Sequence, residues 1–382
     1  MNFGCSSKQS HSLSYLKEYK LLTLIFAALK KTPLLKRFFQ RLYRWELWPF
    51  YIIYAPLGFV WVYYAIKARA FWFFSPVNPT LEFSGFEGES KKEMYQQLPE
   101  ELFPKTGYVP VSSTAQEVIQ IARELEFVYP VAVKPDVGMQ GMMFRKINNE
   151  DELLRYHEHC PADYLIQDLV ELPVEYSVFH IRYPDEEKGM ITGLIEKIYL
   201  QVKGDGRSTL EQLIEKHPKA CFRMEEMRKK HGGNFDKIIP AGQPYYLSIA
   251  GNHNRGAKFI NLHTEIDERL CKVFDNISKQ AGSFYYGRYD LKCTSLEDLK
   301  NGLNISILEY NGAGAEPNHI YDCNMSYWNA LKVIAVHWKY LYEIGKINHR
   351  KGVRYWGFFE GRNYLARARA FFTVLNKYDL TY

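Results

Sequence analysis

The sequence predicts an α+β fold that is preceded by a membrane-associated helical segment. Three observations support this prediction. An uncharged, aromatic-rich run of twenty residues lies at 47–66. After the segment SPVNP at 75–79, helix-capping motifs alternate with apolar runs of strand length. Several of these runs follow one another as in β-hairpins, which is typical of antiparallel sheets and not of a regular doubly wound sheet.

Charge and cysteine content narrow the class of protein. The 382 residues allow two or three domains. Residues 1–80 carry a net charge of +9 while the whole chain carries +6, so the remainder is slightly acidic and no nucleic-acid partner is expected. The six cysteines form no Cys-x-x-Cys pair and no cluster with histidine, which predicts free thiols in a reducing compartment and no zinc site.

Residues 1–80 have the features of a segment that associates with a membrane. The run LWPFYIIYAPLGFVWVYYAI at 47–66 is long enough to cross a bilayer core as a helix. Eight of its twenty residues are aromatic, and Trp and Tyr favour the membrane–water interface. Upstream, residues 33–45 alternate apolar pairs with Lys and Arg, as in a basic helix on an anionic membrane surface. The alternative is an aromatic-rich core helix with a solvated basic face.

The flanking charges bear on the orientation of this run. Arg41 and Arg44 precede it, and Lys67 and Arg69 follow it. Positive flanks prefer the cytoplasmic side of a membrane. A re-entrant hairpin that turns back at 55–58 places both flanks there, and a single span with the amino terminus outside is the alternative. The expected location is therefore the cytoplasmic face of a membrane.

Regular elements are predicted for the rest of the chain. Helix starts are marked by a capping residue that is followed three residues later by Glu. These starts are Thr114, Asn149, Ser208 and Thr294. Apolar runs predict strands at 130–135, 164–170, 175–183, 189–202, 284–293 and 305–311. The carboxyl-terminal residues 326–382 are rich in aromatics and Arg and are predicted to be helical.

One predicted strand ends in a lysine beside a glycine-containing loop. Lys134 and Pro135 end the strand, and Gly138 and Gly141 follow in the loop. A strand-end lysine with flexible backbone N–H groups suits a phosphate. The loop is not a P-loop, because GxxxxGK[ST] is absent. An ordinary glycine hairpin between two strands is the alternative.

Two further segments have chemistry that suits a nucleotide. Backbone groups from Gln167 to Leu169 could pair with a flat heterocycle, and Glu175 could accept hydrogen bonds from ribose hydroxyls. The alternative is a connection between sub-domains with a surface Glu. Arg255 and Lys258 lie in a Gly/Asn-rich loop, and their charges suit phosphate oxygens. The alternative is a solvated basic loop.

Polar pairs mark two late strands. Arg288 and Asp290 are two residues apart in FYYGRYDLKC, and Glu309 and Asn311 are two residues apart in ISILEYN. Residues i and i+2 of a strand point to the same face. If the two strands are neighbours, Asp290, Glu309 and Asn311 converge as oxygen ligands for Mg²⁺, with Arg288 beside them. The alternative is a strand end whose polar residues enter a loop.

The order of these motifs resembles the ATP-grasp superfamily. Gly287-Arg288-Tyr289-Asp290 and Glu309-Tyr310-Asn311 are similar to the strand pair of D-alanine–D-alanine ligases. Residues 202–214 and 251–267 resemble the ligase domain of cyanophycin synthetases. The resemblance covers roughly residues 85–325. It implies an ATP-grasp domain at 81–325, in which a nucleotide sub-domain (105–165) and a catalytic sub-domain (166–325) clasp ATP, with 1–80 and the helical extension 326–382 outside it.

The resemblance also implies a role for individual residues. Lys134 and Lys91, with Lys92 as the alternative to Lys91, are expected on the ATP phosphates. Gly138 and Gly141 are expected in the loop that closes over the triphosphate. The adenine contact is assigned to Gln167, Asp168 and Leu169. The ribose contact is assigned to Glu175 and the γ-phosphate contact to Arg255. Two Mg²⁺ ions are expected on Asp290, Glu309 and Asn311, with Glu309 bridging them and Arg288 stabilising an oxyanion.

The implied activity is an ATP-dependent carboxylate–amine ligase that forms an amide through an acyl phosphate. Two departures from the family's pattern matter. Gln167 stands where the resembled ligases often carry Glu, and residues 312–322 differ from the ligases' turn, so D-alanine is not implied as the acceptor. Membrane attachment leads to the hypothesis that the carboxylate or the amine is lipid-linked, with tethering to a partner complex as the alternative. The competing functions are an ATP-grasp phosphotransferase and a nucleotide-binding scaffold.

Overall fold

The computed structural model describes residues 44–139, 141–248, 251–321 and 325–381. The chain forms two compact units, Met1–Pro56 and Leu57–Tyr382. In the described part of the first unit, the short helix α3 (Phe50–Tyr54) has the Phe50 ring stacked on that of Tyr54, with centroids 4.3 Å apart. The basic helix predicted at 33–45 lies almost wholly outside the described residues.

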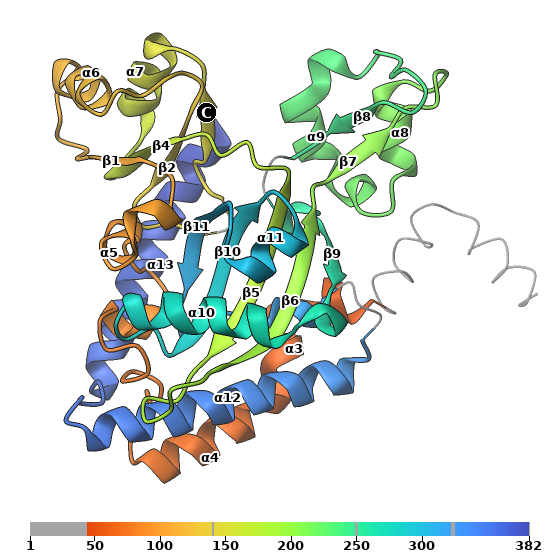
Figure 1. Cartoon of the computed structure of the whole chain (residues 1–382). Helices are drawn as coiled ribbons and strands as arrows, with labels where there is room; N and C mark the ends of the chain where they lie inside the picture. The colour runs from red at the N-terminus through yellow and green to blue at the C-terminus, as the bar shows by residue number, and fades with distance from the viewer. Residues whose placement is uncertain (1–43, 140, 249–250, 322–324, 382) are drawn as a thin grey trace, which may run out of the picture. The chain divides into compact units, whose positions relative to one another are not determined.

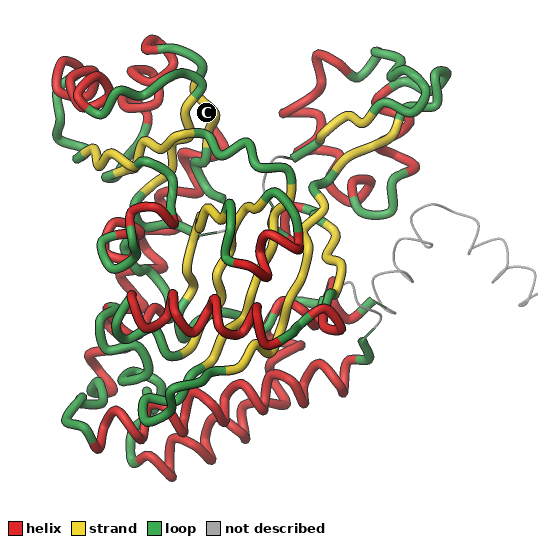
Figure 2. The backbone as a smooth tube through the Cα atoms, in the orientation of Figure 1, coloured by secondary structure: helices red, strands yellow, loops and turns green. Residues whose placement is uncertain are grey.

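The second unit contains a four-stranded antiparallel sheet of order β1-β4-β2-β3. Strands are yellow and helices red in Figure 2. Its strands are β1 (Thr106–Val109), β2 (Val131–Pro135), β3 (Arg145–Ile147) and β4 (Tyr164–Asp168). Helices α6 (Ala115–Glu124) and α7 (Glu150–His159) bury Val118, Leu153 and Tyr156 against the sheet. Short helix α5 (Lys91–Tyr95) precedes the sheet in the chain and buries Met94 and Tyr95 in the neighbouring core.

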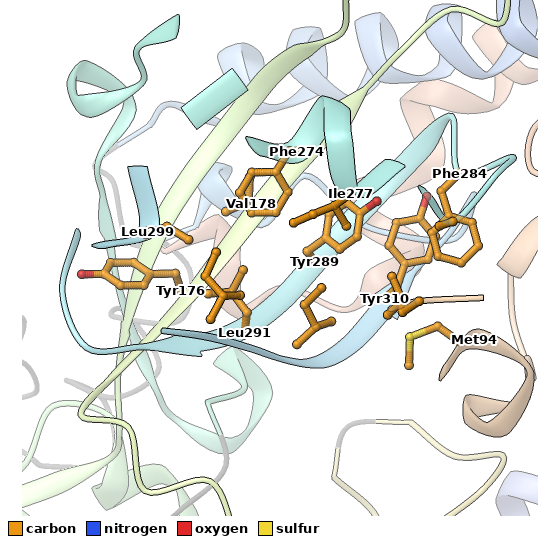
Figure 3. Packing of buried hydrophobic residues seen from close by; sticks show 14 of the residues in the cluster. Met94, Tyr176, Val178, Phe274, Ile277, Phe284, Tyr289, Leu291, Leu299 and Tyr310 are labelled. Carbon is orange, nitrogen blue, oxygen red and sulfur yellow. The ribbon is translucent and has the colours of Figure 1, made fainter. Parts of the chain in front are cut away.

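A five-stranded antiparallel sheet has the order β11-β10-β5-β6-β9. Its strands are β5 (Val174–Ile181), β6 (Met190–Ile198), β9 (Lys258–Asn261), β10 (Tyr286–Cys293) and β11 (Ile305–Asn311). Helix α10 (Glu268–Gln280) lies across one face, and α11 (Leu296–Asn301) lies beside it (Figure 1). Phe274 and Ile277 of α10 pack there against apolar side chains such as Val178 (Figure 3). Because strand side chains alternate, the polar residues of β5 and β10 lie on the opposite face.

A small module is inserted between β6 and β9. It comprises β7 (Gln201–Lys203), β8 (Pro244–Tyr246), α8 (Leu210–Lys216) and α9 (Met224–His231). The two strands pair in an antiparallel ladder. Leu210, Ile214 and Met227 form part of its own apolar core.

A third core is built from aromatic residues far apart in the sequence. Helices α4 (Gly58–Ala68), α12 (Tyr327–Arg350) and α13 (Phe358–Thr381) pack around residues 72–83. Phe73 and Phe74 are fully buried there, and Tyr64 of α4 stacks on Tyr342 of α12 with ring centroids 5.0 Å apart. The carboxyl-terminal half of α13 instead joins the core of the four-stranded sheet through Ala368, Phe372 and Leu375. Helix α13 therefore connects two cores.

The structure confirms the predicted α+β class with antiparallel sheets. All six predicted strands form, but the run at 189–202 is split into β6 and β7. Two helix starts are wrong by one residue, because Thr209 and Ser295 cap α8 and α11 in place of Ser208 and Thr294. In each case the neighbouring hydroxyl accepts the hydrogen bond from the backbone N–H three residues later.

The aromatic run near the amino terminus is helical in the structure. Among the described residues, Phe50–Ala68 is the one helical stretch long and apolar enough to cross a membrane by length and composition. Only 11% of its most apolar window is buried in the protein. A core helix of a soluble protein would be mostly buried, but length and composition alone do not establish a membrane helix.

Candidate active site

The strands that carry the two polar pairs are neighbours. Asp290 of β10 stands directly opposite Glu309 of β11, and Arg288 stands opposite Asn311. Directly opposed residues of antiparallel strands share a face. The four side chains therefore lie on one face of the five-stranded sheet, opposite the face covered by α10. On its other side Asp290 is in register with Ser177 of β5.

Asp290 is the most enclosed carboxylate of this face, with 6% of the residue exposed. Its carboxylate lies 3.0 Å from Arg288 Nη2 and 3.0 Å from Lys197 Nζ, and it accepts a hydrogen bond from the Ser177 hydroxyl. Burial by itself would raise the pKa of Asp290, but Arg288 and Lys197 lower it far below the usual value. The carboxylate is therefore ionised at any physiological pH.

Sequence reasoning missed Lys197. This lysine lies on β6, 6% exposed at its side chain, between Glu175 Oε1 at 2.9 Å and Asp290 Oδ1 at 3.0 Å. The attraction of the two carboxylates keeps the pKa of Lys197 raised even though burial lowers it. A signal was present, because a lysine inside the apolar run GLIEKIYL is unusual for a buried strand without a partner.

Glu175 of β5 lies on the same face, two residues before Ser177. Its carboxylate accepts hydrogen bonds from Lys197 Nζ at 2.9 Å and from the Tyr199 hydroxyl at 2.6 Å. The backbone at Gly251 covers it so closely that a Cβ there would lie 2.4 Å from Glu175 Oε1. A ribose hydroxyl would thus have to replace one of these partners, and the predicted ribose contact stays a prediction.

Two lysines reach Glu309 and its strand from the side of the four-stranded sheet. Lys134 Nζ donates to the Leu308 carbonyl oxygen at 2.9 Å and to the Tyr95 hydroxyl at 2.8 Å. Burial lowers the pKa of Lys134 to about 8. Lys91 Nζ lies 3.7 Å from Glu309 Oε1 and donates to the Gly138 carbonyl oxygen at 3.1 Å.

The structure distinguishes between the two lysines at the start of α5. Lys92 Nζ lies 3.9 Å from the centre of the Tyr108 ring, whereas Lys91 lies beside Glu309. The carboxylate of Asp136 accepts from the Lys92 backbone N–H at 2.8 Å and so fixes the start of this helix next to the end of β2. Lys91 is thus the lysine that lies beside Glu309, and its role on the ATP phosphates stays a prediction.

The predicted adenine segment is largely part of a strand. Gln167 is in register with Thr106 of β1 and with Ala132 of β2, and its side chain donates to the Thr106 hydroxyl at 2.6 Å. The Asp168 backbone N–H donates to the Lys105 carbonyl oxygen at 3.1 Å. Gln167 and Asp168 belong to β4, and Leu169 follows directly after the end of the strand.

The glycine loop and Arg255 contact the carboxyl-terminal helix. A Cβ added at Gly138 would lie 3.9 Å from Leu375 Cδ1, and Gly141 has a positive φ of 69° that favours glycine. Arg255 Nη2 donates to Asp379 Oδ2 at 3.1 Å, and its Nη1 lies 3.9 Å from Glu226 of α9.

The oxygen groups of the sheet face suit a hard cation. In the described part of the chain no cluster combines three or more His, Cys, Asp or Glu residues at ligand distances. Asp290 and Glu309 nevertheless supply two carboxylates from opposed positions, and Asn311, whose amide donates to Asp290 at 3.3 Å, adds an amide oxygen. This donor set is of the kind that Mg²⁺ accepts together with phosphate oxygens.

No family model and no curated protein matches the chain. Solved structures to which it is similar include a bifunctional glutathione synthetase from Pasteurella multocida, at 18% identity over 64% of this chain and 35% of that chain, with a TM-score of 0.37. A D-alanine–D-alanine ligase from Bacillus anthracis is 14% identical over 69% of each chain, with a TM-score of 0.38. The VanG D-Ala:D-Ser ligase from Enterococcus faecalis is 14% identical over 69% of this chain and 62% of that chain, with a TM-score of 0.39. The chain spans about a third of the first of these proteins and under two thirds of the last.

Proposed function

We propose that this protein is an ATP-dependent carboxylate–amine ligase that forms an amide through an acyl phosphate. The observation that carries the proposal is the polar face of the five-stranded sheet. Asp290, Glu309 and Asn311 lie together on it, beside Arg288. Lys91 of α5 and Lys134 of β2 approach the same strand. Phosphoryl transfer needs carboxylates that hold a metal ion, next to basic side chains that bind the phosphate groups.

The chemistry has two steps. An oxygen of the carboxylate substrate attacks the γ-phosphorus of ATP, and the bond to the bridging oxygen breaks so that ADP leaves. The amine then attacks the acyl carbon, phosphate leaves with its bonding electrons, and the amine loses a proton. Lys134 and Lys91 would hold ATP phosphates, and Arg288 would stabilise the oxyanion. Mg²⁺ held by Asp290, Glu309 and Asn311, two ions by family resemblance, would neutralise phosphate charge.

Two other functions would use the same face. A phosphotransferase would stop after phosphorylating an alcohol and would need no amine. A scaffold would bind Mg-ATP without turnover. The site around Asp290 favours an enzyme over a scaffold, because ionisable groups whose pKa is strongly shifted by burial and by specific charged partners cluster at catalytic sites.

The test is ADP release by the purified protein in detergent with Mg-ATP, a panel of amino acids and a membrane-lipid extract. We expect release that requires both a carboxylate and an amine, and mass spectrometry of the product should show a new amide. A phosphorylated alcohol formed without amine would identify a phosphotransferase. Bound Mg-ATP without ADP release under every condition would favour the scaffold.

We also propose that the protein works on the cytoplasmic face of a membrane, with one substrate lipid-linked. The support is the exposed stripe of α4, made of Phe59, Val62, Tyr63 and Ile66, which are 84%, 53%, 52% and 71% exposed. These positions follow the i, i+3, i+4, i+7 spacing of one helix face. The opposite stripe, which includes Trp61 and Tyr64, packs into the aromatic core. An apolar stripe left exposed in this way suits the acyl region of a bilayer.

Replacing Phe59 and Ile66 together with Ser is expected to weaken binding to phosphatidylserine-containing vesicles. Each side chain that leaves the bilayer loses on the order of 1.5–3 kcal/mol, so the dissociation constant should rise at least about a hundredfold. Vesicle co-sedimentation measures it. The matched control is Ile238→Ser, which removes an apolar side chain that is 56% exposed on the small module. Equal binding by the double variant and the control would contradict membrane contact through α4.

A further inference from the structure

The last turn of α13 makes contacts that the proposed reaction does not use. Asp379 Oδ1 lies 3.0 Å from Arg145 Nη1 and accepts a hydrogen bond from the Met143 backbone N–H at 3.0 Å. Its other oxygen accepts from Arg255 Nη2 at 3.1 Å. The side chain of Asp379 is 9% exposed. One carboxylate thus joins the segment after the glycine loop to the loop that carries Arg255.

The position of this carboxylate is unfavourable for the helix itself. Asp379 lies in the last turn of α13, where the negative end of the helix dipole repels an anion. Burial also acts against its charge, but the Met143 N–H, Arg145 and Arg255 outweigh burial and lower the pKa of Asp379. Helix stability alone therefore gives no reason for an aspartate here, whereas the two arginines do.

The partners of Asp379 are those that a phosphate anion would use. A guanidinium pair and a backbone N–H donate to phosphate oxygens in the same way as they donate to a carboxylate. Arg255 is the residue for which a γ-phosphate contact is expected, and the loop with Gly138 and Gly141 is expected to close over the triphosphate. In the structure both are held by the carboxyl-terminal helix.

We propose that Asp379 is an autoinhibitory latch: it occupies Arg255 and Arg145 while no nucleotide is bound, and the triphosphate of ATP displaces it. The inference rests on the proposed function, because it requires ATP phosphates at Arg255. The release involves only the end of α13. Leu375, one turn earlier, is fully buried in the core of the four-stranded sheet and anchors the helix, whereas residues 376–378 are exposed. Terminal helical turns open at little cost in free energy.

The direct test is the affinity of the Asp379→Asn variant for Mg-ATP, measured by calorimetry at about 0.15 M salt. Asparagine keeps the shape of the side chain and removes its charge, so the triphosphate no longer competes with an anion. The dissociation constant for Mg-ATP should fall about 5–20-fold, in the lower part of the range of typical coupling between two binding events in one protein. The matched control is Glu360→Gln, which removes a charge from the first turn of the same helix, where Glu360 pairs with Arg354 at 2.6 Å.

The outcomes separate this inference from the proposed function. Wild-type binding of Mg-ATP with tighter binding by Asp379→Asn, and no change in Glu360→Gln, supports both. Wild-type binding with equal or weaker binding by Asp379→Asn overturns the latch and leaves the proposed function intact. Absence of Mg-ATP binding in wild type and variant overturns both. The Asp379→Glu variant, which keeps the charge, should bind like wild type, and thermal melts of all variants show whether a changed affinity reflects unfolding.

Discussion

The Glu309→Gln variant is expected to release ADP about 10²–10³-fold more slowly than the wild type, a loss similar to that of removing one group that stabilises charge in a transition state. Glu309 stands opposite Asp290 and is the residue that the family resemblance assigns to both Mg²⁺ ions. Glutamine keeps the size of the side chain and one oxygen but not the charge. ADP release at saturating Mg-ATP measures the effect, and raising Mg²⁺ should restore part of the rate.

This loss should not come from unfolding. The Glu309 side chain is 34% exposed and lies 3.7 Å from Lys91 Nζ, so the change in the free energy of unfolding should stay below about 1 kcal/mol. The control is Glu297→Gln, an exposed glutamate of α11 that pairs with Arg269. If Glu309→Gln released ADP at more than a third of the wild-type rate while Glu297→Gln was normal, the metal role of Glu309 would be wrong.

The Lys197→Met variant is expected to lower the free energy of unfolding by about 3 kcal/mol. Lys197 is the cation shared by two buried carboxylates, Glu175 and Asp290. Asp290 keeps Arg288 as a partner, but Glu175 loses its ion pair with Lys197 and keeps the hydrogen bond from the Tyr199 hydroxyl. Urea denaturation in a non-ionic detergent, followed by tryptophan fluorescence, measures the change.

A matched lysine, Lys292, lies on β10, two strands away from β6 in the same sheet. Lys292 donates to the Val170 carbonyl oxygen at 2.8 Å, so Lys292→Met should cost only about 1 kcal/mol. The double variant Lys197→Met/Glu175→Gln should regain part of the stability, because it removes the buried charge that the single variant leaves unpaired. Equal destabilisation by Lys197→Met and Lys292→Met would show that the shared ion pair contributes little.

Sequence patterns of short range predicted much of the architecture. The capping pair Thr114–Glu117 forms as expected, and the strand of ISILEYN has the predicted bounds. The spacing of Asp290 from Arg288, and of Asn311 from Glu309, placed each pair on one strand face. These features depend on backbone geometry within a few residues, which local sequence specifies.

Features of longer range could not be read in this way. The sequence did not show that β10 and β11 are neighbouring strands, because this depends on the strand order of the sheet. The position of Lys197 between two carboxylates likewise depends on β6 lying next to β5. Residues 326–382 were predicted to be helical, but nothing in their pattern indicated that α13 would end at the glycine loop.

Local periodicity, capping and residue chemistry in this chain thus specified the α+β class, most strands and the residues that carry oxygen or positive charge. Which of these residues meet was decided by tertiary structure. Lys197 approaches Asp290 across 93 residues of sequence, and Asp379 approaches Arg145 across 234. Such contacts form because buried charges must find partners and apolar faces must be covered, and many distant segments can satisfy either need. Only the packed sheets and helices select one of them.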